Sequence, residues 1–313
     1  MPVSWPDAVD EVLAGDMTAA LSYATPAKGA VPSAVAPIGM RDRNAGAVTF
    51  TTSLGFGRKL DRIEADPRIS LAYHARDHGR SRRTEYVLVE GRAEPDPNPS
   101  KARRDEVRDR ARDFLGEAKS GFFWDRWMRE YYMVRIPVDV RIERLVVWPD
   151  LRCEGEPEVL GAPLPEPPAP QSPPKKGTGP RVDMEKTARR LGQLPHLLLS
   201  YVREDGYPAV VPVELRSAGG SGFELGAARE DLIPPGGRRA GLLGHSYRPQ
   251  LVGLVSQVHT GWLESSGDGT ASYSPHTSGG FKAPPNKTLL ALANGFLAKR
   301  GVKKARREGK IAA

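Results

Sequence analysis

The chain has 313 residues, 39% of them hydrophobic, and a formal net charge of +8, a length that favours two domains with separate cores. No apolar run reaches the roughly 18–20 residues of a membrane helix, and a single cysteine, Cys153, excludes a disulfide framework and a cysteine-rich metal site. The start of the chain also lacks a signal-peptide pattern, so we expect a cytoplasmic protein without a membrane partner or a bound metal.

The first half of the chain alternates short strand patterns with a few helix patterns. A helix capped by Asp7 comes first, and Pro67 ends a second helix. In chain order we expect a helix from residue 7, strands at 18–25, 32–38 and 47–52, a helix at 57–65, strands at 68–74 and 85–93, helices at 100–118 and 122–131, and a closing strand or strand pair at 132–148 broken near Pro137. Many short strands with few helices favour an antiparallel barrel over a doubly wound sheet.

A proline-rich segment follows at residues 154–180, with nine prolines in 27 residues. Proline fixes φ and removes a hydrogen-bond donor, so this composition favours an extended, semi-rigid linker. It divides the chain into a first domain at 1–153 and a second at 181–298.

The second half repeats the opening of the first. Leu21-Ser22-Tyr23 recurs as Leu199-Ser200-Tyr201, and in both places an apolar strand, a Gly/Pro turn and another apolar strand follow. Residues 249–258 then fall where residues 67–74 fall in the first half. We therefore expect a mainly β protein with α-helices (α+β), built of two tandem antiparallel split β-barrels with flanking helices.

The end of the chain holds most of the charge. Residues 299–310 contain seven lysines and arginines and one glutamate, so this segment carries +6 and the rest of the chain only +2. A basic protein would suggest a nucleic-acid partner. Since the body is nearly neutral, we expect a solvated basic tail at 299–313 and regard nucleic acid as an unlikely partner.

Three segments of the first half carry a family resemblance: VTFTTSLGFGRKLDRIEADPRISLAYHA (48–75), YVLVEGRAE (86–94) and YYMVRIPVDVRIERLVVWPD (131–150). Together they resemble the split-barrel flavin-binding family that includes pyridoxamine 5'-phosphate oxidase and the flavin or deazaflavin reductases. The resemblance covers about residues 8–150. It implies a flavin cofactor held between two barrels, and two copies in one chain could form an internal pseudo-dimer, with a homodimer as a further possibility.

A phosphate site can be read from the same residues. A strand ends at Thr51, Thr52 and Ser53, and Arg58 and Lys59 open the next helix. Hydroxyl donors, cationic side chains and a helix N-terminus all favour a phosphate dianion. An ordinary polar loop with a solvated Arg-Lys pair is the alternative.

The resemblance further implies that Ser33, Ala34 and Val35 on the second strand face the isoalloxazine ring, with their backbone groups meeting its polar edge. The second half has lost the phosphate residues, since residues 226–249 carry neither a Thr/Ser strand end nor an Arg-Lys helix, although Arg238 and Arg239 could hold an anion. We expect one competent site, built mainly by the first barrel and walled by the second.

Other residues carry weaker alternatives. His74 and His78 have metal-ligand spacing only on a helix, and here they follow a strand. Some split-barrel proteins bind haem through a histidine, for which His245 and His276 are candidates. Trp124 and Trp127 are typical of core or interface aromatics, with a place in the cofactor or substrate cavity as the alternative.

These observations predict a pyridoxamine 5'-phosphate oxidase-like oxidoreductase that transfers a hydride between FMN and a small organic substrate. The deazaflavin F420 is the alternative cofactor, because Arg80, Arg82 and Arg83 could meet its acidic tail, and haem is less favoured. No catalytic side chain is identified. A non-catalytic flavin- or haem-binding split-barrel protein is the alternative function.

Overall fold

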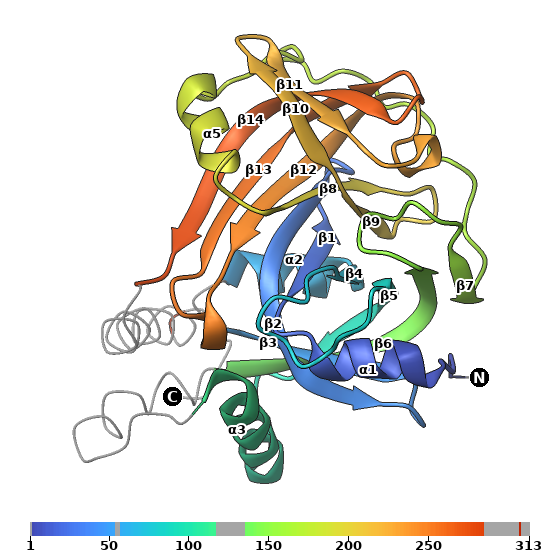
Figure 1. Ribbon diagram of the computed structural model, residues 1–313, viewed down its shortest axis with the longest axis vertical. Coiled ribbons are helices and arrows are strands. Elements are labelled where there is room, and N and C mark those ends of the chain that lie inside the picture. Colours follow the sequence, from blue (N-terminus) through green and yellow to red (C-terminus); the bar gives the residue numbers. More distant parts are fainter. Residues whose placement is uncertain (1, 54–56, 117–134, 285–306, 308–313) are drawn as a thin grey trace.

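The computed structural model describes residues 2–53, 57–116, 135–284 and 307. It contains two seven-stranded antiparallel sheets, one in each half of the chain, with helices around them (Figure 1). The predicted fold class is confirmed: the protein is mainly β, and its two curled sheets fit two split barrels. The predicted helix at 122–131 and the basic tail lie outside the described residues, apart from Arg307.

The first sheet closes into a barrel. Its elements are α1 (Asp7–Gly15), β1 (Ala19–Ala24), β2 (Ala30–Asp42), β3 (Ala47–Ser53), α2 (Gly57–Ala65), β4 (Arg68–Tyr73), β5 (Tyr86–Pro95), α3 (Lys101–Leu115), β6 (Arg135–Trp148) and β7 (Glu158–Gly161). The strand order is β3-β2-β1-β4-β5-β6-β7, and β3 also pairs with β6, so six strands form the barrel and β7 lies outside it.

One local expectation about the first barrel is wrong, and one that had two alternatives is decided. Pro6 occupies the N-cap position of α1 without a side-chain cap, and Asp7 instead forms an ion pair with Arg43 at 2.6 Å. β6 runs as one strand through Pro137, which lies opposite Thr51 of β3. Proline removes one donor from this strand but does not break it.

The second sheet curls in the same way. Its elements are α5 (Met184–Leu191), β8 (His196–Val202), β9 (Pro208–Pro212), β10 (Glu214–Gly219), β11 (Gly222–Gly226), the 3-10 helix η2 (Glu230–Leu232), β12 (Gly236–Ser246), the 3-10 helix η3 (Pro249–Leu251), β13 (Val255–Ser265) and β14 (Thr270–Lys282). The order is β10-β11-β14-β13-β12-β8-β9. Only Val213 separates β9 from β10, so together they occupy the position that β2 has in the first sheet.

The pairing pattern corrects one expected correspondence. β4 pairs with β1, and the strand that pairs with β8 in the same way is β12, not residues 249–258. Those residues form η3 and the start of β13. Ser70 lies opposite Ser22 and Gly241 opposite Ser200, so the position of His74 corresponds to that of His245.

The two barrels pack on each other through corresponding strands, in a contact that we call the seam. β1, β2 and β4 of the first barrel meet β8, β9 and β12 of the second. The Ser22 and Ser200 hydroxyl oxygens are hydrogen-bonded at 2.7 Å, and Nε2 of His74 lies 2.6 Å from Nε2 of His245. Corresponding residues therefore touch each other at the centre of the seam.

The proline-rich segment is extended, and it packs on both barrels. Its strand β7 extends the first sheet beside β6. Further along, the Gln171 backbone N–H donates to the Gly237 carbonyl at 2.7 Å, and the Gln171 side chain donates to the Lys28 carbonyl at 2.9 Å. The segment thus joins the barrels by contacts as well as by chain connection.

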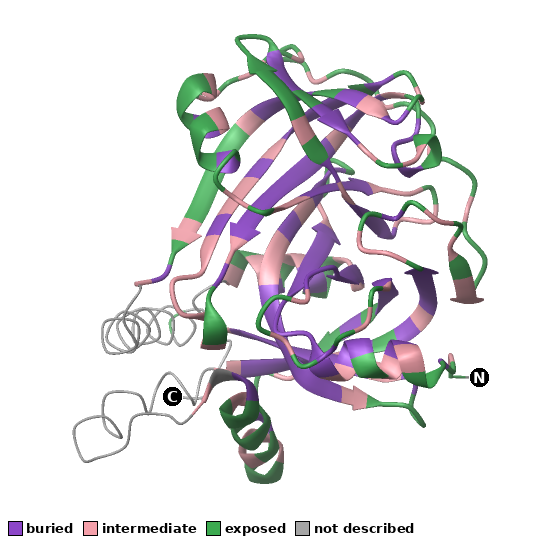
Figure 2. Cartoon of the chain, viewed as in Figure 1, coloured by how far each residue is buried: buried purple, intermediate pink, exposed green. Residues whose placement is uncertain are grey.

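Apolar side chains fill each barrel, and buried residues dominate most of the strands while α3, α5 and the proline-rich segment are largely exposed (Figure 2). Leu21, Phe50 and Ile136 belong to the first core, and Leu199, Leu242 and Tyr273 belong to the second. Within the described part of the chain, no helix is long and apolar enough to cross a membrane.

Candidate functional site

Strand alternation divides the predicted hydroxyls between the two faces of the first barrel. Thr52 lies opposite Ile136, whose side chain is in the core, so Thr52 faces inward. Thr51 and Ser53 therefore lie on the outer face, where Ser53 pairs with Arg135. The Arg135 guanidinium donates to the Thr51 hydroxyl at 2.6 Å. The outer face thus carries two hydroxyls and a cation at the end of β3.

Arg135 is a member of this group that no local sequence pattern indicates by itself. Its position opposite Ser53 depends on the register between β3 and β6, which are more than 80 residues apart in sequence. The alternation of polar and apolar residues along 135–141 does indicate that Arg135 and Asp139 share the outer face. That signal becomes useful only once β6 is known to lie beside β3.

The helix α2 brings further positive charge to this end of the strand. Its Leu60 and Ile63 enter the core, while Arg58 is exposed and Lys59 half-buried. Desolvation lowers the pKa of the Lys59 amine to about 8. Nη1 of Arg62, one turn further on, is buried without a hydrogen-bond partner among the described residues.

The helix and the strand end lie close in space. Three residues, 54–56, join Ser53 to Gly57 and lie outside the described part, but a connection of this length spans at most about 14 Å. A partly desolvated amine on α2 and the hydroxyls at the end of β3 are both groups that can bind an anion.

The three predicted ring-contact residues on β2 do not share a face. Val35 is in the barrel core, and Ser33 lies opposite Leu21, which is also in the core. The Ser33 hydroxyl is buried and has no hydrogen-bond partner within the described residues. Ala34 is therefore the one member of this triplet whose side chain lies on the outer face, and it is half-buried there.

The second barrel lies against this part of β2. β12 and β13 both contact β2, and a Cβ built on Gly241 would lie 2.3 Å from Cδ of Pro32 and 2.5 Å from the Ala30 carbonyl oxygen. The glycine thus permits a close approach of the two backbones. The outer face of β2 near Ala34 continues directly from this seam.

The corresponding place in the second barrel lacks the strand-end hydroxyls of the first. Gly226 occupies the position of Thr51, because Glu214 pairs with Gly226 as Ala36 pairs with Thr51. Arg229 nearby pairs with Asp231 at 2.9 Å and Glu156 at 2.7 Å. Within the described chain this site has no strand-end hydroxyl, although the Arg216 guanidinium lies against Gly226.

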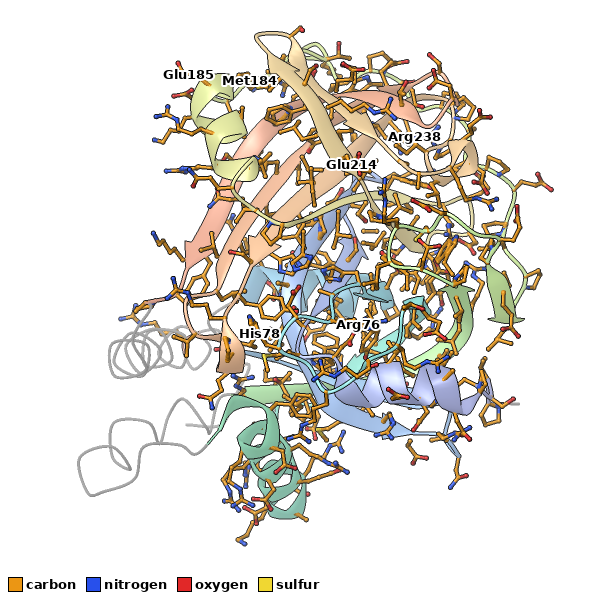
Figure 3. All side chains as sticks on the ribbon, viewed as in Figure 1. Arg76, His78, Met184, Glu185, Glu214 and Arg238 are labelled. Carbon is orange, nitrogen blue, oxygen red and sulfur yellow. The ribbon has the colours of Figure 1, made fainter. Side chains whose placement is uncertain are left out.

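Arg238, a candidate for holding an anion, instead donates hydrogen bonds to backbone carbonyl oxygens. Arg238, which is labelled in Figure 3, is 1% exposed and donates to the carbonyl oxygens of Pro168, Pro234 and Pro235. Arg239 donates to the Gln171 side chain at 3.1 Å. Both arginines therefore hold the proline-rich segment and the turn before β12.

The arginines considered for an acidic cofactor tail differ in their contacts. Arg80 lies over the Phe114 ring at 4.7 Å and donates to the Asp113 carbonyl. Arg83 pairs with Glu85. The side chain of Arg82 is exposed. Two of the three thus already have partners on this chain.

The histidine candidates are separated. His74 is buried and bound to His245, whereas His78 is exposed. Nε2 of His276 lies 3.2 Å from the Thr178 carbonyl oxygen. In the described ranges no three His, Cys, Asp or Glu side chains are arranged to hold a metal ion. Trp124 and Trp127 lie outside those ranges.

Comparison with known proteins gave matches among solved structures alone: no family model and no curated protein matches the chain. A protein related to general stress protein 26 (pyridoxinephosphate oxidase family) from Clostridium acetobutylicum is 8% identical, covers 49% of this chain and 88% of its own, and has a TM-score of 0.32. A pyridoxamine 5'-phosphate oxidase-related FMN-binding protein from Nostoc punctiforme is 9% identical, with coverages of 63% and 87% and a TM-score of 0.31.

An F420 reductase is 18% identical, covers 44% of this chain and 94% of its own, and has a TM-score of 0.30. The similar solved structures thus include pyridoxamine 5'-phosphate oxidase-related proteins and an F420 reductase.

Proposed function

We propose that the first barrel binds a phosphorylated flavin, FMN or the deazaflavin F420, and that the protein is an oxidoreductase acting on a small organic substrate. The observation that carries this proposal is the group of anion-binding side chains at the end of β3. Thr51 and Ser53 share the outer face with Arg135, and α2, which begins three residues after β3, adds Lys59.

Different residues of the chain would bind different parts of the flavin. Thr51, Ser53, Arg135, Lys59 and Arg58 would hold the phosphate through hydroxyl donors and cationic groups. The outer edge of β2 at Ala34 would lie along the ring, and the second barrel, packed against β2, would exclude water from one side. The flavin, when bound, supplies the centre that accepts or donates the hydride, so the protein contributes position, charge and desolvation.

The seam supports an internal pseudo-dimer with one site in each chain. Corresponding residues of the two barrels touch at Ser22–Ser200 and His74–His245, as the subunits of a symmetric dimer would. The second barrel has Gly226 and a carboxylate-paired Arg229 where the first has its anion-binding groups. It therefore serves as a wall for the first.

Absorbance spectroscopy of the purified protein, followed by titration with FMN and F420, tests the proposal. We expect one flavin per chain, and the visible spectrum distinguishes FMN, F420 and haem. A protein that takes up neither flavin would refute the proposal. A haem spectrum, or flavin binding without turnover of any acceptor, would support the non-catalytic alternative.

Substitutions locate the site. We expect Arg135→Ala, and the double variant Arg58→Ala with Lys59→Ala, to weaken flavin binding by about ten- to a hundredfold, the range for a charge-assisted hydrogen bond. Arg141→Ala is the matched control, because Arg141 lies on the outer face of the same strand but is 72% exposed and reaches Glu94 at 3.7 Å. Equal affinities in all three variants would show that the site is elsewhere.

A further inference from the structure

Three histidines meet at the seam between the barrels. His74 follows β4 of the first barrel, and His196 and His245 lie on β8 and β12 of the second. The ring centroids of His74 and His245 are 4.9 Å apart, as are those of His196 and His245, and His74 and His196 are 5.6 Å apart. His74 and His245 are buried, and the contact joins the two barrels directly.

The hydrogen bonds fix the proton on each ring. Nδ1 of His74 lies 2.9 Å from the Ala72 carbonyl oxygen, which can only accept, so Nδ1 carries the proton. Nε2 of a neutral His74 then has only a lone pair and accepts from the N–H at Nε2 of His245, 2.6 Å away. Nδ1 of His245 is left with a lone pair, and it has no hydrogen-bond partner among the described residues.

An additional proton on either ring would destabilise this arrangement. A proton on Nε2 of His74 would set one N–H against another at 2.6 Å and abolish the hydrogen bond across the seam. A proton on Nδ1 of His245 would create a buried cation whose new N–H has no acceptor among the described groups. Either protonation opposes contact between the barrels.

The surrounding charges do not compensate for such a proton. From the segment after β4, Arg76 contributes positive charge and pairs with Asp16, while His78 lies against Tyr247 (Arg76 and His78 are labelled in Figure 3). Asp77, from the same segment, lies 2.8 Å from Nε2 of His196 and is committed to that histidine. On the side of β12, the neutral Tyr247 ring stacks on His245.

The electrostatic environment acts in the same direction. Burial lowers the pKa of His74 to about 3, and the pKa of His245 falls well below its ordinary value because of burial and the neighbouring His74 and His196. Burial also lowers the pKa of His196, although Asp77 opposes this effect. All three rings are therefore neutral at pH 7.

We propose that His74, His196 and His245 form an acid-sensitive lock between the two barrels, in which neutral rings hold the seam closed and protonation of the separated rings below about pH 6 favours its opening. The lock is independent of any cofactor. A histidine that binds a proton less readily in the folded state has a folded pKa below its unfolded pKa of about 6.5. The free energy of unfolding then falls as the pH drops below about 6.5, and it continues to fall until the pH reaches the folded pKa.

The pH dependence of urea unfolding of the chain without added cofactor tests the lock. At pH 5.0 each such histidine shifts the folding equilibrium about thirtyfold toward the unfolded state relative to pH 7.5. Between pH 7.5 and pH 5.0, the folding equilibrium of the double variant His74→Gln with His245→Gln should therefore shift toward the unfolded state about a thousandfold less than that of the parent. His276→Gln, which changes a histidine that contacts the proline-rich segment, is the control and should behave as the parent.

A double variant with the full pH dependence of the parent would overturn the proposal. Nitrogen NMR of the histidine rings in the parent protein provides a second measurement that needs no variant. We expect His74 protonated at Nδ1 alone and His245 at Nε2 alone at pH 6. Ordinary titration of both rings near pH 6.5 in the folded protein would equally contradict the lock.

Discussion

A buried ion-pair network at the seam gives a quantitative test of how the barrels are joined. Glu90 of β5 is fully buried, and its two carboxylate oxygens accept from Arg144 of the first barrel at 2.5 Å and from Arg203 of the second at 2.7 Å. Arg144 also donates to Asp205 of the second barrel at 2.7 Å. Two guanidinium groups thus share two carboxylates across the seam.

The substitution Glu90→Gln removes one negative charge and almost no volume. Breaking a buried ion pair costs about 3–5 kcal/mol, because the remaining charge stays desolvated. Asp205 would still neutralise Arg144, which leaves Arg203 as the main uncompensated group. We therefore expect the free energy of unfolding to fall by about 3 kcal/mol at pH 7, measured by urea denaturation.

Glu94→Gln is the matched control on the same strand. Glu94 is 69% exposed and lies 3.7 Å from Arg141, so its loss should change the free energy of unfolding by about 0.5 kcal/mol or less. A loss below about 1 kcal/mol for Glu90→Gln, or equal losses for the two variants, would refute the assignment of Glu90 as a charge on which the seam depends.

Two further predictions concern the close approach at the seam and the anion site. Gly241→Ala should lower the free energy of unfolding in urea by about 1–3 kcal/mol, because the added Cβ would meet Pro32 and the Ala30 carbonyl. Gly219→Ala, with no atom within 4 Å of the added Cβ, should leave it nearly unchanged. Similar losses in the two variants would contradict the packing. Flavin affinity should fall about tenfold between pH 7 and pH 9, because the phosphate needs the protonated Lys59 and its amine has a pKa of about 8. Lys59→Arg should remove this decrease in a titration followed by fluorescence, and a pH-independent parent would exclude the role of Lys59.

Local pattern was sufficient for most elements of the first barrel. The apolar alternation of residues 47–53 and the proline after residues 57–65 are both signals that act within a few residues, and β3 and α2 lie where those signals predict them. β12 was missed because GGRRAGLLGHS has two glycines and two arginines at its start, a composition typical of a loop. Arg238 can be buried in that strand because Pro168, 70 residues earlier, supplies a carbonyl to its guanidinium.

The faces of the strands determine what the sequence could reveal of the candidate site. The family resemblance implies that backbone groups of Ser33, Ala34 and Val35 meet the polar edge of the ring, whereas the side chains of consecutive strand residues point to opposite faces. Because Leu21 lies in the core, its partner Ser33 must face the core as well, which leaves Ala34 outside. The same logic places Thr51 and Ser53 outside with Arg135 and turns Thr52 inward. A one-residue error in register would reverse every one of these assignments, so the site follows from the pairing of β2, β3 and β6, which no single stretch of the sequence contains.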